Sequence, residues 1–119
     1  MQRYFFDFKC GDNLKVSANF NDKTLYLYPT GELDHHGAKK AMLSIESRID
    51  LTLPRECVLD LRHITFMDSS GIAVILKTHR LVNEAGGRLT VENVPAQAMR
   101  VIDAAGIDRI VPISALAKE

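Results

Sequence analysis

The sequence predicts a single α/β domain with a mixed central sheet. From about residue 34 onward, short apolar runs alternate with longer segments whose apolar residues recur at helical spacing. Before that point, two strand-like runs follow each other with only a short turn between them, which predicts an antiparallel hairpin. A chain of 119 residues without a linker-like stretch suits one hydrophobic core, so residues 1–119 are predicted to form one domain.

The hairpin is predicted from residues 14–20 and 24–28, which are rich in apolar and β-branched side chains. Asn21, Asp22 and Lys23 between them are typical of a tight turn. The aromatic run at residues 4–8 has two possible roles, because residues 1–12 could form an extra edge strand or a hydrophobic arm.

Three helices are predicted, and one is expected to follow Asp34. In that first helix the apolar residues recur on one face: Ala38, Ala41, Met42, Ile45 and Ile49. The second helix is expected from about Ser70 to the glycine pair at residues 86–87, which suits a left-handed helix end. The third begins after Pro95 and ends near Gly106.

Further strands are predicted at residues 57–61, 88–92 and 110–113. Together with the hairpin they give a central sheet of four to five strands with three to four helices. The alternating order favours parallel pairing in this half of the chain, with the helices covering it.

Composition narrows the classes of partner. Fifteen basic and fifteen acidic residues cancel, and neither sign forms a long block, so direct binding to nucleic acid is not expected. The longest apolar run, residues 72–76, is too short to cross a bilayer, and residues at the amino terminus do not resemble a secretion signal, so we expect no membrane contact and a cytoplasmic location. Cys10 and Cys57 lack the spacing of a redox or metal motif, and no disulfide is expected.

The most informative segment is residues 66–71, Phe-Met-Asp-Ser-Ser-Gly, which lies between a predicted buried strand and the second helix. Serines at such a point fall in the first helical turn, where backbone N–H groups lack partners and the helix dipole favours negative charge. A phosphate on Ser69 or Ser70 would be tolerated there. The simpler interpretation is that a serine caps the helix, which is worth about 1 kcal/mol.

Four segments in order resemble the anti-sigma factor antagonists of the STAS family, especially the bacterial sporulation and stress-response members. These are residues 31–36 (Gly-Glu-Leu-Asp-His-His), 66–71, 85–89 (Ala-Gly-Gly-Arg-Leu) and 105–110 (Ala-Gly-Ile-Asp-Arg-Ile). The resemblance extends over residues 15–113 and implies a single STAS domain. One departure is that Gly71-Ile72-Ala73 stands where many relatives have Gly-Leu-Gly.

The resemblance implies partner switching. In its unphosphorylated form such a protein binds an anti-sigma factor that is also a serine kinase, and the sigma factor is released. The kinase uses ATP to phosphorylate the serine after the motif's aspartate, and a serine phosphatase of the metal-dependent class reverses the step. The residue that matches the phosphoacceptor is Ser69, and Ser70 is the alternative acceptor.

The residues expected to contact the partner surround that serine. They are Glu32, Asp34, Met67, Asp68, Ser69, Ser70, Gly71 and Ile72. Structural roles compete with this interpretation, since Asp34 and Asp68 are also suited to capping a helix and Gly71 to relaxing the turn.

Catalysis and bound cofactors are not expected. No Gly-x-Ser-x-Gly elbow, phosphate loop or dinucleotide fingerprint occurs, so the domain is predicted to be a substrate of a kinase and not an enzyme. His35 and His36 are adjacent, should diverge from each other, and do not have the spacing of a metal-ligand pair. Two alternatives remain: a STAS scaffold of a transporter or signalling complex that does not use its serine, and a small hydrolase or nucleotide-binding enzyme. A monomer or weak dimer is expected.

Overall fold

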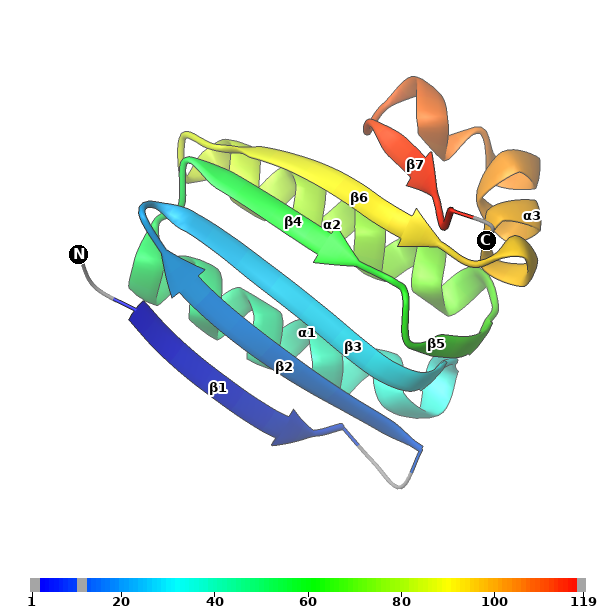
Figure 1. The fold of residues 1–119 in the computed structure, drawn as a ribbon, viewed down its shortest axis with the longest axis horizontal. Coiled ribbons are helices and arrows are strands. Elements are labelled where there is room, and N and C mark those ends of the chain that lie inside the picture. Colours follow the sequence, from blue (N-terminus) through cyan, green and yellow to red (C-terminus); the bar gives the residue numbers. More distant parts are fainter. Residues whose placement is uncertain (1–2, 11–12, 118–119) are drawn as a thin grey trace.

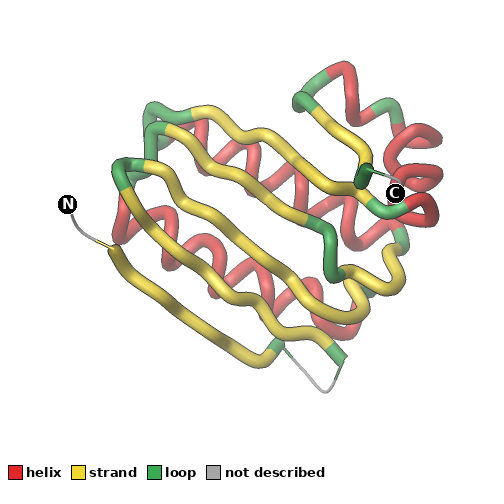
Figure 2. The backbone as a smooth tube through the Cα atoms, viewed as in Figure 1, coloured by secondary structure: helices red, strands yellow, loops and turns green. Residues whose placement is uncertain are grey.

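A computed structural model describes residues 3–10 and 13–117, which form one mixed sheet with the two longest helices on one face (Figures 1 and 2). The strands are β1 (Arg3–Lys9), β2 (Leu14–Asn21), β3 (Thr24–Leu33), β4 (Glu56–Asp60), β5 (Ile64–Met67), β6 (Arg88–Val94) and β7 (Ile113–Ala115). The helices are α1 (His35–Thr52), α2 (Ser69–Glu84), α3 (Ala96–Ala105) and a short 3-10 turn, η1 (Ile107–Arg109).

Within the described residues the sheet has seven strands: six follow the order β1-β2-β3-β4-β6-β7, and β5 pairs beside the end of β3. The first three are antiparallel neighbours, and β3, β4, β6 and β7 are parallel. Because successive parallel strands are added in one direction, crossovers of one hand bring α1 and α2 to the same face, as Figure 1 shows. The fold class and the hairpin are therefore confirmed.

Side-chain alternation explains why that face is covered. Through residues 14–18 of β2 and 25–29 of β3 every second residue is buried, including Val16, Leu25 and Leu27 with exposures of 0%. These side chains meet the apolar faces of the helices, for example Ile45 of α1 and Ile75 of α2. The residues between them, such as Tyr26 and Tyr28, belong to the opposite face, where their rings stack with centroids 6.3 Å apart.

Three details differ from the sequence prediction or complete it. The sheet has more strands than the four to five predicted, because residues 64–67 form β5 and do not belong to the turn, and because the amino-terminal run forms β1. The last strand begins at Ile113 and not at residue 110, because Ile110 and Val111 donate backbone hydrogen bonds to Ile107 and continue η1. The aromatic run is an edge strand within Arg3–Lys9, whereas residues 1–2 and 11–12 of the proposed arm lie outside the described residues.

The predicted helix limits are confirmed closely. Asp34 caps α1, and the chain leaves α2 and α3 through Gly86 and Gly106, with φ of +89° and +70°. None of the helices in residues 3–10 and 13–117 is long and apolar enough to span a membrane.

Candidate functional site

Two strand-aspartate-helix units lie side by side at the carboxyl ends of β3 and β5. The strands are parallel, with Leu33 opposite Met67. The next residue in each case is an aspartate that caps a helix, Asp34 for α1 and Asp68 for α2. The Asp68 N–H also donates to the Leu33 carbonyl at 3.4 Å, so the loop with the acidic residues and the loop with the serines are neighbours.

The serine loop, which comprises Asp68, Ser69 and Ser70, is stabilised by the Asp68 side chain as the helix cap and not by a serine. The Asp68 carboxylate accepts a hydrogen bond from the Ser70 N–H at 2.7 Å, and Asp68 has the extended backbone of an N-cap residue. Ser69 and Ser70 are the first two residues of α2, so the interpretation of either serine as the cap is wrong. Ser69 is exposed and Ser70 is half-buried, and within the described residues neither hydroxyl forms a hydrogen bond.

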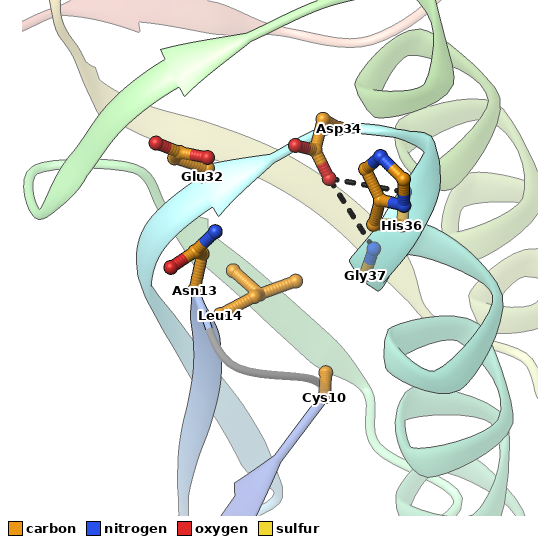
Figure 3. Close-up of a pocket in the computed structure, with 7 residues that line it drawn as sticks. All are labelled: Cys10, Asn13, Leu14, Glu32, Asp34, His36 and Gly37. Atoms are coloured by element: carbon orange, nitrogen blue, oxygen red, sulfur yellow. Dashed lines mark hydrogen bonds between the residues drawn. The ribbon is translucent and has the colours of Figure 1, made fainter.

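The acidic loop borders a cavity of about 370 Å³, shown in Figure 3. The carboxylate of Asp34 accepts hydrogen bonds from the N–H groups of His36 at 3.0 Å and Gly37 at 3.3 Å, which confirms its capping role. Glu32 approaches the cavity from the end of β3. Among the described residues, those that line the cavity are Cys10, Asn13, Leu14, Glu32, Asp34, His36 and Gly37, and they place two carboxylates beside one histidine.

The histidine pair does not diverge as the sequence interpretation expected. The rings of His35 and His36 lie 4.1 Å apart with a tilt of 34°, and both side chains are exposed. Across the described part of the chain, no group of three or more His, Cys, Asp or Glu side chains could hold a metal ion.

Two of the predicted contact residues support the loop from beneath. Met67 is 0% exposed, and Gly71 is buried against it. A Cβ at Gly71 would overlap Cγ of Met67 and lie 2.7 Å from its Sδ, so a larger residue here would force the Met67 side chain to shift. Ile72 is half-buried against the core. Of the residues predicted to contact the partner, Met67 and Gly71 are therefore buried and do not belong to the exposed surface.

Sequence reasoning missed two residues at this site. Gln97 of α3 hydrogen-bonds both backbone groups of Met67, and it is 30 positions away in the chain, so no local pattern identifies it. Phe66 is 43% exposed on β5 and lies opposite Glu32 in the β3–β5 register. Alternation would not have revealed its exposure, because Ile64 and Met67 are buried whereas Thr65 and Phe66 between them are both exposed.

The two cysteines are both buried, and no disulfide joins them. Burial raises the pKa of the Cys57 thiol to about 12. Burial also raises the pKa of Cys10, against the opposing effects of the Lys40 charge and a hydrogen bond with Ser44. Neither environment favours the thiolate, so neither residue has the character of a reactive nucleophile.

Comparison with known proteins identifies the family. The family model for the STAS domain matches residues 15–118. The chain is 34% identical to the anti-sigma F factor antagonist of Paenibacillus polymyxa over 85% of this chain and 86% of that protein. It is 31% identical to the anti-sigma-B factor antagonist of Bacillus subtilis over 87% of this chain and 93% of the relative.

Solved structures agree on the fold. The unphosphorylated anti-sigma factor antagonist SpoIIAA superposes with a TM-score of 0.72 at 23% identity, covering 87% of this chain and 89% of that one. The phosphorylated form of the Bacillus protein SpoIIAA gives a TM-score of 0.62 at 22% identity, covering 98% and 93%. The family model, the two relatives and the fold agree with one another. The chain therefore belongs to the STAS domain family and groups within it with the anti-sigma factor antagonists.

Proposed function

We propose that this chain, when unphosphorylated, binds an anti-sigma factor that is also a serine kinase and thereby releases a sigma factor. Phosphorylation of Ser69 switches the binding off, with Ser70 as the alternative acceptor. A serine phosphatase of the metal-dependent class restores the active form. Under this proposal the chain is the kinase's substrate, has no catalytic role of its own, and acts in the cytoplasm.

The observation that carries the proposal is the position of Ser69. It is the first residue of α2, is exposed, and has a hydroxyl that makes no hydrogen bond within the described residues. A kinase can therefore reach the hydroxyl without unfolding the helix. The curated relatives are named as antagonists of anti-sigma factors, and SpoIIAA has been solved in a phosphorylated form, which supports the same use of the fold here.

A phosphate on Ser69 is expected to act at the interface and not on the fold. A phosphoserine carries about −1.5 to −2 charges at neutral pH, and the amino terminus of α2 would stabilise this charge in the free domain. In a complex the same group would be desolvated beside the Asp68 carboxylate, and an unpaired interfacial charge costs on the order of 2–5 kcal/mol.

Half-buried residues around the exposed Ser69 complete the surface that we propose for the partner. Asp68 and Ser70 flank the acceptor, and Ile72 lies one turn further along α2. Glu32 and Asp34 belong to the neighbouring loop, where two carboxylates at one cavity suit a basic side chain of the partner. We assign Met67 and Gly71 the role of supporting this surface, because both are buried.

The direct test starts from copurification of the partner from the native cell. The chain is then incubated with that partner and ATP, and the products are analysed by mass spectrometry. One phosphate, lost in Ser69→Ala and retained in Ser70→Ala, supports the proposal. A tight complex without phosphate transfer would favour the scaffold alternative, and turnover of a small substrate by the isolated domain would favour the enzyme alternative.

A further inference from the structure

A groove runs between α1 and α2, beginning beside the serine loop. It encloses about 290 Å³ and is lined by His35, Ala38, Lys39, Met42, Ser70, Ala73, Val74 and Lys77. Ser70 belongs both to this groove and to the Ser69 turn, so the groove is continuous with the surface proposed for the partner.

The groove has an apolar floor, and small residues of the two helices leave it open. Ala38 of α1 and Ala73 of α2 leave the space open, and Ala73 is exposed. Met42 and Val74 close it from below, with exposures of 8% and 2%. An apolar side chain that entered from outside would therefore exchange water for these four side chains.

The rim of the groove is basic. Lys39 and His35 are exposed on the α1 side, and Lys77 stands on the α2 side. None of the described residues that line the groove carries a carboxylate. Glu46 lies beside it and pairs with Lys77 at 4.0 Å, with both side chains more than a third exposed, which makes a weak pair that an incoming carboxylate can replace.

We propose that this groove receives a short acidic segment of the anti-sigma partner, with one aliphatic side chain inserted between Ala38 and Ala73. The carboxylates of that segment would meet Lys39 and Lys77 on the two sides. Apolar floor and cationic rim together select such a segment over a basic or purely polar one. This inference rests on the proposed function, because it extends the same partner surface from the serine turn along the two helices.

The test uses the full chain and the copurified anti-sigma partner, with affinity measured by calorimetry at two salt concentrations. Lys39→Glu, alone and with Lys77→Glu, should weaken binding by about tenfold or more, through slower association, and should reduce the salt dependence. Arg80→Glu is the matched control, because Arg80 is an exposed cation of α2 outside the groove. It should leave the affinity unchanged.

A second variant tests the apolar floor independently of charge. Ala73→Leu fills the groove at an exposed helical position, so binding should weaken without unfolding. Ala104→Leu, at an exposed position on α3, is its control and should have no effect. Thermal melting of each variant checks that the fold is intact.

The outcomes separate this inference from the proposed function. If the wild-type chain does not bind an anti-sigma factor at all, the proposed function is wrong. If it binds and Ser69→Asp weakens the complex, but both groove variants bind like wild type, the partner does not enter the groove and the inference is wrong. Sedimentation that shows Ala73→Leu changing self-association, with partner binding unaltered, would assign the groove to a second copy and also overturn the inference.

Discussion

The side-chain amide of Gln97 pairs with both backbone groups of Met67. The Met67 N–H donates to Oε1 of Gln97 at 2.8 Å, and Nε2 of Gln97 donates to the Met67 carbonyl at 2.8 Å. β5 pairs with β3 along one edge only, so its other edge would leave these groups unsatisfied. Gln97 therefore takes the place of a neighbouring strand and fixes the residue that precedes the Asp68–Ser69 turn.

Gln97→Ala should loosen β5 locally and lower the free energy of unfolding by about 1–3 kcal/mol, because two part-buried backbone groups lose their partners. Amide hydrogen exchange of Met67 should accelerate more than that of Leu27 in the centre of the sheet. Gln97→Glu is the control, because it keeps the acceptor and loses the donor. A Gln97→Ala protein with wild-type exchange at Met67 would contradict this role.

Gly71→Ala should destabilise the domain by about 1–3 kcal/mol, because the added methyl group overlaps Met67 and must displace it. Urea denaturation measures the change. The double variant with Met67→Val should lose less than the sum of the two single changes, since the smaller side chain relieves the overlap. Strict additivity of the two changes would rule out direct contact as the cause.

The Asp68 side chain caps α2 and also carries a negative charge, and substitutions can separate these two effects. Asp68→Ala should cost about 1 kcal/mol of stability through loss of the bond to the Ser70 N–H, whereas Asp68→Asn should cost much less, because asparagine caps equally well. If Asp68→Asn nevertheless changes partner affinity or phosphorylation rate, the carboxylate charge itself is used in recognition. Equal destabilisation by both changes would argue against the capping role.

Stability should fall in alkaline solution partly because of Cys57. Its pKa is raised to about 12 by burial, against an ordinary value of 9.0, so the unfolded chain releases this proton at a lower pH than the folded one. The stability that depends on a protonated Cys57 thiol is fully present below the pKa of this group in the unfolded chain, and it is lost as the pH rises from about 9 toward 12. Cys57→Ala should show a shallower decline in unfolding free energy between pH 8 and 10, by at most about 1.4 kcal/mol per pH unit. An identical decline in both proteins would show that Cys57 is not the group responsible.

The fold could be predicted largely from local signals. The apolar stripe of the first helix, the Asp34 cap and the Gly106 helix end are all encoded within a few residues, and the structure has each of them where it was predicted. β5 was missed because four residues with one exposed aromatic carry too little periodicity to separate a strand from a turn.

The sequence located the candidate site in the fold, but it did not show which of its residues are buried or what supports them. The serines and the two aspartates form a recognisable pattern, yet nothing in residues 66–71 tells that Met67 is buried or that a glutamine of a later helix holds it. The groove between α1 and α2 likewise depends on how two distant helices pack, which Ala38 and Ala73 do not reveal individually. Long-range packing, and not local propensity, decides these features.

The central claim is that phosphate on Ser69 acts at the interface and not on the fold. Calorimetric titration of the anti-sigma partner into the unphosphorylated chain and into the chain phosphorylated on Ser69, with the melting temperature of each form, tests it most directly. We predict a loss of binding of about 2–5 kcal/mol with almost no change in melting temperature. Equal affinity of the two forms, or a loss of affinity that occurs only together with unfolding, would contradict the claim.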